Sequence, residues 1–495
     1  MKKSIIYTCM LFLLGMLFVA CDVLEEKVES KIVAETYFTT AEQLANAVNP
    51  IYYEFCDLCD NNTRFNGICL GANDVTTNPA YTVLVEFETF NISGSNDKLK
   101  YWWKGFYKAI KACNNIIVNS PKVPDSEEKN IALGQAYFGR AWAYFWLVRV
   151  HNRIPLLLDI DMHPDIKLSE PTVVYEQIID DLKKAETLLP DSYSDYRAKI
   201  AYTKGTAKSV LSLVYLTMAG YPVKDASMYA LAAQKAKEVI DNKDVWGYRL
   251  LDSCAELWKN VKYNDEIILG YYFNNQNGVA NQSSPYNGMP SEWTGWDGYF
   301  AELNFYKKFP EGPRKDATFG KEYPVKNADG SISIVDYTQL KMKHPYYRKM
   351  WDYDGMNWEE PWIYYDWTSS RTTVAMRYAE VLLIYAEAKA MSSSPDESAY
   401  DAINQVRRRA GLPDLTPGLS QTAFRDSVIA ERAWEFAGLE ANGSNWFDLV
   451  RTERVEEAAA DRDPSEIPIL TPPTKDDYFA PIPDYDVLLN PKLKD

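Results

Sequence analysis

Hydrophobic residues recur at helical spacing over much of the chain, and the segments that carry this pattern come in pairs. Apolar side chains at i, i+3, i+4 and i+7 mark one face of an α-helix. Residues 204–219 pair with 226–241, and residues 375–391 pair with 398–410, each pair being separated by a short break that contains Pro. Further segments show the same pattern: 101–117, 127–150, 172–189 and 422–437. Paired helices of this length with Tyr- and Ala-rich faces resemble tetratricopeptide hairpins, so we expect a mainly α fold with such hairpins as its scaffold.

The helical pattern stops between residues 243 and 370, where Gly, Pro, Asn and aromatic residues gather. Within this stretch, the apolar run 267–273 has the length and composition of a β-strand. A long loop-rich segment inside a helical chain more often carries function than fills space. We therefore expect a loop-rich, partly β region that binds ligand.

The N-terminus has the pattern of a secretory leader. Lys2 and Lys3 precede an apolar run that ends at Ala20, and this run is short for a membrane span. A small residue directly before Cys21 resembles a bacterial lipobox, in which the cysteine is lipidated and becomes the mature N-terminus. The alternative is a plain signal peptide, residues 1–20, followed by an incidental cysteine. The acidic residues 21–36 are then a lipidated tether.

We expect a single domain over residues 37–495. Its helical scaffold comprises 37–242 and 371–460, and its binding region comprises 243–370. The last segment, 461–495, contains seven Pro and is expected to lie extended on the body.

Charge narrows the classes of ligand. The net charge is −16, which argues against nucleic acid and anionic membrane surfaces because both attract Lys and Arg patches. Uncharged ligands remain open. The chain has three His, so catalysis by a His dyad or a His-rich metal site has few candidate residues.

Five cysteines follow the leader and Cys21, namely Cys56, Cys59, Cys69, Cys113 and Cys254. An odd number excludes a complete disulfide framework. The spacing between the first two also occurs in zinc sites, but those need a second ligand pair. Buried thiols, one disulfide and a metal site all stay open, with buried thiols favoured.

Several motifs resemble one known family in the order in which it carries them. Arg377–Ala388 and Ile403–Pro413 match its two C-terminal helices, and Glu431–Ala437, Trp446–Arg451 and Pro481–Pro491 match the elements that follow. Earlier segments match as well: 101–117, 135–158 and 204–222. The chain resembles the SusD/RagB-like outer-membrane lipoproteins that bind nutrients. It departs from the family pattern in two places, at His151-Asn152-Arg153 and at Asn445, where the family usually has Arg.

The resemblance implies a binding protein on the outer surface of the outer membrane. Its members capture oligosaccharides, or in some cases peptides, and pass them to a SusC-like TonB-dependent transporter. They are not enzymes and need no catalytic cofactor, although some hold a structural calcium ion. Four charged residues of these motifs are expected to form a structural ion-pair network under the helices: Glu431, Glu435, Arg407 and Arg451.

Aromatic residues outside the helical pattern are the candidate ligand contacts. A sugar ring stacks its C–H face on an aromatic ring, and its hydroxyl groups bond to Asn, Asp, Arg and Tyr. The candidates from the loop-rich region are Trp293, Trp296, Tyr299, Trp351, Trp358 and Trp362. A second candidate loop runs from Asn73 and Asp74 to Tyr81. The competing interpretation of each ring is core packing.

Two functional alternatives and one ion site stay open. A lipid-anchored glycoside hydrolase needs two carboxylates across a cleft, and the acidic content leaves this open. A pure protein-interaction scaffold is the other alternative, since helical repeats commonly bind proteins. The run from Asp352 to Glu360 gathers the oxygen ligands that calcium prefers, without the spacing of an EF-hand.

Overall fold

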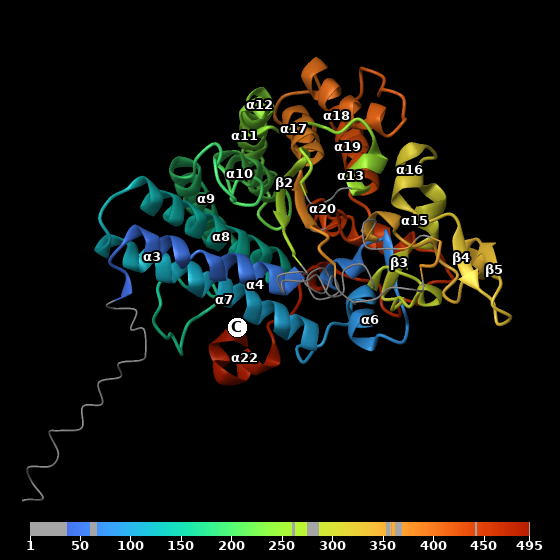
Figure 1. Cartoon of the computed structure of the whole chain (residues 1–495), viewed down its shortest axis with the longest axis horizontal. Coiled ribbons are helices and arrows are strands. Elements are labelled where there is room, and N and C mark those ends of the chain that lie inside the picture. Colours follow the sequence, from blue (N-terminus) through green and yellow to red (C-terminus); the bar gives the residue numbers. More distant parts are fainter. Residues whose placement is uncertain are drawn as a thin grey trace, which may run out of the picture.

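The computed structural model describes residues 37–59, 67–259, 263–274, 287–352, 357, 359–361, 369–440 and 443–494 (Figure 1). Helices dominate it, as the periodicity predicts. The first part contains α3 (Ala41–Asn46), α4 (Asn49–Cys59), α6 (Thr82–Glu88), α7 (Asp97–Asn119), α8 (Glu127–His151), α9 (Pro171–Leu188), α10 (Lys204–Ala219) and α11 (Met228–Asp241). The second part contains α17 (Tyr378–Ser392), α18 (Glu397–Arg409), α19 (Gln421–Glu435), α20 (Ser444–Arg451) and α21 (Val455–Ala460).

The predicted helix pairs pack as hairpins. Helix α8 packs against α7 and α9, α10 packs against α11, and α17 packs against α11 and α18. Helix α8 is central, and its Trp142 and Trp146 are fully buried. Polar side chains define where helices begin: the hydroxyl of Ser126 accepts from the Lys129 N–H, and Thr203 forms a capping box with Thr206.

The loop-rich region is built from short elements. Its described residues include the short helices α12 (Lys243–Trp246), α13 (Cys254–Lys259), α15 (Leu303–Lys308) and α16 (Pro313–Thr318). The predicted strand is confirmed as β2 (Ile267–Tyr271), which pairs antiparallel with β6 (Thr373–Arg377). Two further antiparallel pairs join β1 (Val75–Thr77) to β3 (Tyr299–Ala301) and β4 (Tyr323–Lys326) to β5 (Ile332–Val335). Figure 1 places β3, β4 and β5 at the opposite end of the long axis from α3.

The C-terminal segment differs from the extended chain expected for it. It contains α22 (Asp484–Leu489) and two 3-10 turns, at Lys475–Tyr478 and Pro491–Lys494. It does lie on the body, since the Ala480 N–H donates to the Val150 carbonyl at 2.8 Å. The His151 Nδ1 lies 3.0 Å from the Ala480 carbonyl oxygen, and burial lowers the pKa of this imidazole to about 4. The family-atypical His151 therefore holds the C-terminal segment against α8.

A buried cluster of ion pairs joins the loop-rich region to the helices. Arg377, at the end of β6, bonds to Glu266 at 2.7 Å and to Glu435 at 2.9 Å. Arg409 of α18 bonds to the same two carboxylates, at 2.6 Å to Glu266. All four side chains are buried, and the surrounding guanidinium groups hold the pKa of Glu435 well below its usual range despite its burial.

The predicted structural network is confirmed and is larger than expected. Arg407 bonds to Glu431 at 3.0 Å, and Glu431 also accepts from Arg314 of α16. Arg451 belongs to a neighbouring buried cluster, where it bonds to Glu387 and, at 2.7 Å, to Asp448. Buried charges of this kind persist only where partners and hydrogen bonds compensate the loss of water.

The structure bears on the predicted states of the cysteines and on the predicted metal site. Cys69, Cys113 and Cys254 are buried thiols, and burial raises the pKa of Cys254 to about 11. Within the described ranges, no group of three or more His, Cys, Asp or Glu side chains is placed to hold a metal ion. Most of the Asp352–Glu360 run lies outside the described residues. No helix among the described residues is long and apolar enough to span a bilayer.

Neighbouring arginines on α18 provide a test of the buried cluster. We expect Arg409→Met to lower the free energy of unfolding by about 3–5 kcal/mol, because it leaves two buried carboxylates short of a partner. Arg408→Met is the matched control, since Arg408 is exposed and pairs with Asp414 at the surface. Urea unfolding followed by circular dichroism measures both. Equal losses from the two substitutions would contradict a special role for the buried cluster.

Candidate ligand-binding surface

Two segments that the sequence marks separately as ligand candidates lie next to each other. Strand β1 follows Asn73 and Asp74, and it pairs with β3 in the register Val75↔Ala301 to Thr77↔Tyr299. The pairing continues beyond the strands, because the Thr77 hydroxyl donates to the Gly298 carbonyl at 2.7 Å. The loop after β1 thus lies beside the loop before β3.

Tyr81 and Trp296 present the accessible part of this junction. The Tyr81 hydroxyl donates to the Trp296 carbonyl at 2.8 Å, which ties the two loops together. Tyr81 is 37% exposed and Trp296 is half-buried, so both residues keep part of their surface accessible to solvent. Burial and the nearby Asp297 carboxylate raise the pKa of Tyr81, so its hydroxyl keeps its proton at neutral pH.

The other described tryptophans of the region pack beneath the surface. Trp293 and Trp351 are 1% and 2% exposed, and their ring centroids lie 4.9 Å apart. Each indole N–H is satisfied internally, that of Trp293 by the Pro324 carbonyl at 2.8 Å and that of Trp351 by the Gly288 carbonyl at 2.9 Å. Tyr299 is fully buried as well. The structure gives these three rings a packing role, and a ring so buried presents no face to a ligand in this conformation.

Asp297 fixes the loop that carries Trp296. Its carboxylate accepts from the Tyr346 hydroxyl at 2.6 Å and from the Ser291 N–H at 2.8 Å. Asp297 is 1% exposed, and Lys341 lies 3.7 Å from its second oxygen. These bonds anchor the loop to the buried Tyr346, which favours a preformed binding surface.

Asp74 is buried and connects β1 to the C-terminal helices. Its carboxylate accepts from the Gly438 N–H and from the Asn445 side-chain amide, both at 2.7 Å. The pKa of Asp74 is raised, mainly by burial. Asn73 is half-buried and accepts from the same amide at 3.1 Å. Asp74 therefore positions the strand, and Asn73 lies beside it in a separate groove lined by Trp434.

A cleft of about 800 Å³ borders the aromatic cluster. Trp293 and Trp351 form part of its wall, and exposed Ile332 and Ile334 of β5 form another part. Charged side chains surround it: Asp316, Lys321, Glu322, Arg348 and Glu359. Trp358 and Trp362 are neighbours of Glu359 in sequence, but they lie outside the described residues.

Comparison with known proteins agrees with this architecture. Residues 255–495 match the model of the SusD family, and residues 22–216 match a model described as "starch-binding associating with outer membrane". SusD-like protein P2 of Formosa agariphila is 26% identical over the whole of this chain and 99% of its own length. The chain belongs to the SusD/RagB family. This family comprises non-catalytic binding proteins and is associated with the outer membrane.

Solved structures share the SusD fold. A SusD superfamily protein from Parabacteroides distasonis matches with a TM-score of 0.78 and 22% identity, over 94% of this chain and 99% of that one. A structure named "Laminarin binding SusD-like protein" matches with a TM-score of 0.72 and 24% identity, over 92% and 98% of the two chains. At this identity the likeness establishes the fold, a mainly helical and tetratricopeptide-like one.

Sequence reasoning missed the β4–β5 hairpin and the cleft beside it. The signal was present, since Asp329-Gly330 separates two short runs that contain β-branched residues. It also missed Asn78 and Gly298, which lie where the two loops meet. Asn445 stands where the SusD family usually has Arg. In the structure, its side-chain amide donates to the Asp74 carboxylate.

Trp293 and Trp296, three residues apart, test which rings of this region pack in the interior and which lie at the surface. We expect Trp293→Ala to lower the free energy of unfolding by about 3–5 kcal/mol, because it empties a packed site. Trp296→Ala is expected to cost much less, since that ring is partly in solvent. Urea unfolding monitored by circular dichroism compares them. A larger loss from Trp296→Ala would reverse the assignment.

Proposed function

We propose that the chain is a cell-surface nutrient-binding lipoprotein that captures oligosaccharides and delivers them to a SusC-like TonB-dependent transporter. The observation that carries the proposal is the junction of the β1 and β3 loops, which presents two aromatic rings on a rigid base in a SusD-family fold. Peptides or other nutrients bound in the same way are the alternative ligands. Surface glycoside hydrolysis is disfavoured by membership of a non-catalytic family.

The chemistry of the junction suits a neutral glycan. Tyr81 and Trp296 offer ring faces for the apolar side of a sugar, and the side chain of Asn78, in the same loop as Tyr81, offers polar groups for its hydroxyls. The acidic chain repels anionic ligands but exerts no net force on an uncharged one. The relative named for laminarin binding supports this class of ligand. Trp293, Tyr299 and Trp351 support the surface from below, and Trp358 and Trp362 remain proposed contacts.

Binding of neutral oligosaccharides tests this proposal. Isothermal calorimetry against laminari-, xyloglucan- and malto-oligosaccharides is expected to show binding to at least one of them. Tyr81→Ala and Trp296→Ala should each weaken it about tenfold or more, which corresponds to about 1.4 kcal/mol. Tyr53→Ala is the control, since Tyr53 is an exposed tyrosine on α4. Binding of a peptide mixture in place of every glycan would favour the alternative ligand class, and turnover of a glycan would overturn the assignment as a binding protein.

The lipid anchor has its own test. Cys21 lies outside the described residues, and its lipidation is proposed from the lipobox-like leader and the family's association with the outer membrane. Metabolic labelling with an alkyne fatty acid should mark the wild-type chain and fail to mark Cys21→Ser. Cys9→Ser is the matched control, because Cys9 lies in the leader. Labelling that survives in Cys21→Ser would rule out an anchor on this residue.

A further inference from the structure

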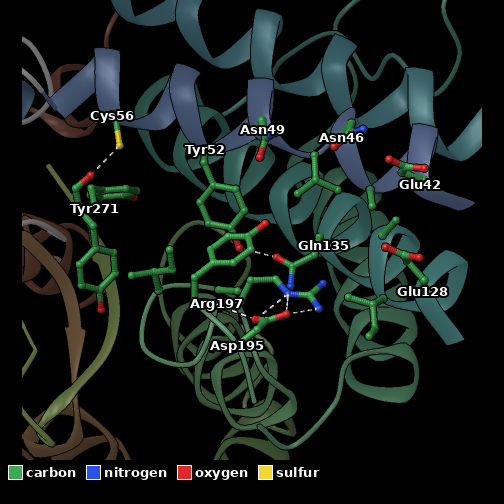
Figure 2. A pocket seen from close by; sticks show the side chains of 18 of the residues that line it. Glu42, Asn46, Asn49, Tyr52, Cys56, Glu128, Gln135, Asp195, Arg197 and Tyr271 are labelled. Atoms are coloured by element: carbon green, nitrogen blue, oxygen red, sulfur yellow. Dashed lines mark hydrogen bonds and ion pairs between the residues drawn. The ribbon is translucent and has the colours of Figure 1, made fainter. Parts of the chain in front are cut away.

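A second pocket lies beneath α3 and α4, away from the Tyr81–Trp296 surface. It has a volume of about 380 Å³ and lies between α3, α4, the start of α8, the segment 195–201 and the end of β2 (Figure 2). Pockets that bind small molecules are of this kind, concave and largely apolar with a few polar groups. Figure 1 shows α3 far from β3, so this pocket is separate from the proposed glycan surface.

The interior of the pocket is carbon-rich because its polar atoms are already used. The Tyr52 hydroxyl donates to Gln135 and accepts from the Tyr202 N–H at 3.1 Å. The Gln135 amide donates to the Tyr202 carbonyl at 3.0 Å and to the Tyr193 hydroxyl. The Tyr52 ring stacks on that of Tyr202 with centroids 4.6 Å apart. Aliphatic side chains complete the wall: Ala45, Val48, Ile131, Ala132, Ile200 and Ala201.

The rim of the pocket is acidic. The charged side chains that line it are Glu42, Glu128, Asp195 and Arg197. Arg197 is neutralised by Asp195, to which it donates at 2.7 Å, as Figure 2 shows. Glu42 and Glu128 lie toward one end of the pocket in the same view, and neither makes an ion pair with any other described residue. The rim therefore carries two negative charges that no cation of the described chain balances.

An exposed aromatic ring lies at the mouth. Tyr196 lies between Asp195 and Arg197 in sequence, lines the pocket and is 82% exposed. An exposed tyrosine ring in a pocket that also carries carboxylates is a favourable feature for an organic cation, since ring face and negative charge both attract it. The amide side chains of Asn46 and Asn49 add hydrogen-bond acceptors at the opposite wall.

We infer that this pocket binds a small organic amine that carries an apolar ring. The ring of the ligand lies in the carbon-lined interior, and its ammonium group lies at Glu42 and Glu128. The volume fits a compact molecule and excludes a long oligosaccharide. The site is independent of the proposed glycan surface, so either can fail without the other.

The presence of Glu42 and Glu128 at these positions has a competing explanation, the stabilisation of helix N-termini. Glu42 and Glu128 lie in the first turns of α3 and α8, where acidic residues stabilise the helix. Glu127 shares the first turn of α8 with Glu128, but it does not line the pocket. Glu127→Gln is therefore a matched control that separates the effect on the helix from the effect on a ligand.

Two isosteric probes test the inference on the full chain at pH 7 and low ionic strength. Tryptamine and indole-3-propionate share a ring and a two-carbon arm and differ in the sign of the terminal charge. Calorimetry or ligand-observed NMR is expected to show tryptamine binding about tenfold or more tightly than the propionate. Equal binding of the two, tighter binding of the propionate, or no binding of tryptamine at millimolar concentration would overturn the inference.

Substitutions locate the site. Ala45→Trp fills the pocket from α3 and should weaken tryptamine binding about tenfold or more, whereas Ala45→Ser should not. The double substitution Glu42→Gln/Glu128→Gln should reduce the preference for the amine to about threefold or less, and Glu127→Gln should preserve it. If Ala45→Trp does not fold, the glutamate variants still decide the question. Tyr81→Ala should leave tryptamine binding unchanged, and a loss there would place the amine on the glycan surface and overturn the inference.

Discussion

The fold depends on a set of buried ion pairs in which arginines from three elements, β6, α16 and α18, share a few carboxylates. Arg377 at the end of β6 and Arg409 of α18 both bond to Glu266 and Glu435, and Arg314 and Arg407 extend the cluster through Glu431. These contacts fix β2 and β6 against α16, α18 and α19. Apolar side chains of these short elements, such as Leu269, Tyr299 and Met376, join the same hydrophobic core as the helices.

The buried charges balance. Seven cationic side chains meet seven carboxylates across this cluster and its neighbour at Arg451: Arg314, Lys349, Arg377, Arg407, Arg409, Arg432 and Arg451 against Glu266, Glu380, Glu387, Glu431, Glu435, Glu440 and Asp448. The net charge of −16 is therefore carried outside these clusters. That distribution suits a binding protein whose proposed ligands are neutral glycans at one site and an amine at another, since both tolerate or favour a negative surface.

Local sequence patterns were sufficient to predict the helices but not the binding surface. Periodicity and capping are properties of neighbouring residues, so α8, α10 and α17 were predictable to within a few residues. The pairing of Thr77 with Tyr299 joins residues more than two hundred positions apart, and nothing local to either segment specifies it. The sequence also does not indicate which aromatic residues of the loop-rich region are buried. Trp293 and Trp296 look alike in sequence, and only the cluster formed with Trp351 and Tyr323 separates a core ring from a surface ring. The C-terminal segment was misjudged because its many prolines suggested extended chain, although short helices such as α22 tolerate Pro at their boundaries.

The hydrogen bonds of Asp74 have a consequence for how the surface beside Tyr81 forms. Its strand pairs with β3, and its carboxylate is held by Gly438 and Asn445 near the other end of the chain. The base of the surface beside Tyr81 is therefore complete only when residues from nearly the whole length of the polypeptide have packed together. A chain still crossing a membrane, or one cut short before residue 438, would carry both loops without their common base. The proposed binding surface thus depends on contacts between the two ends of the chain.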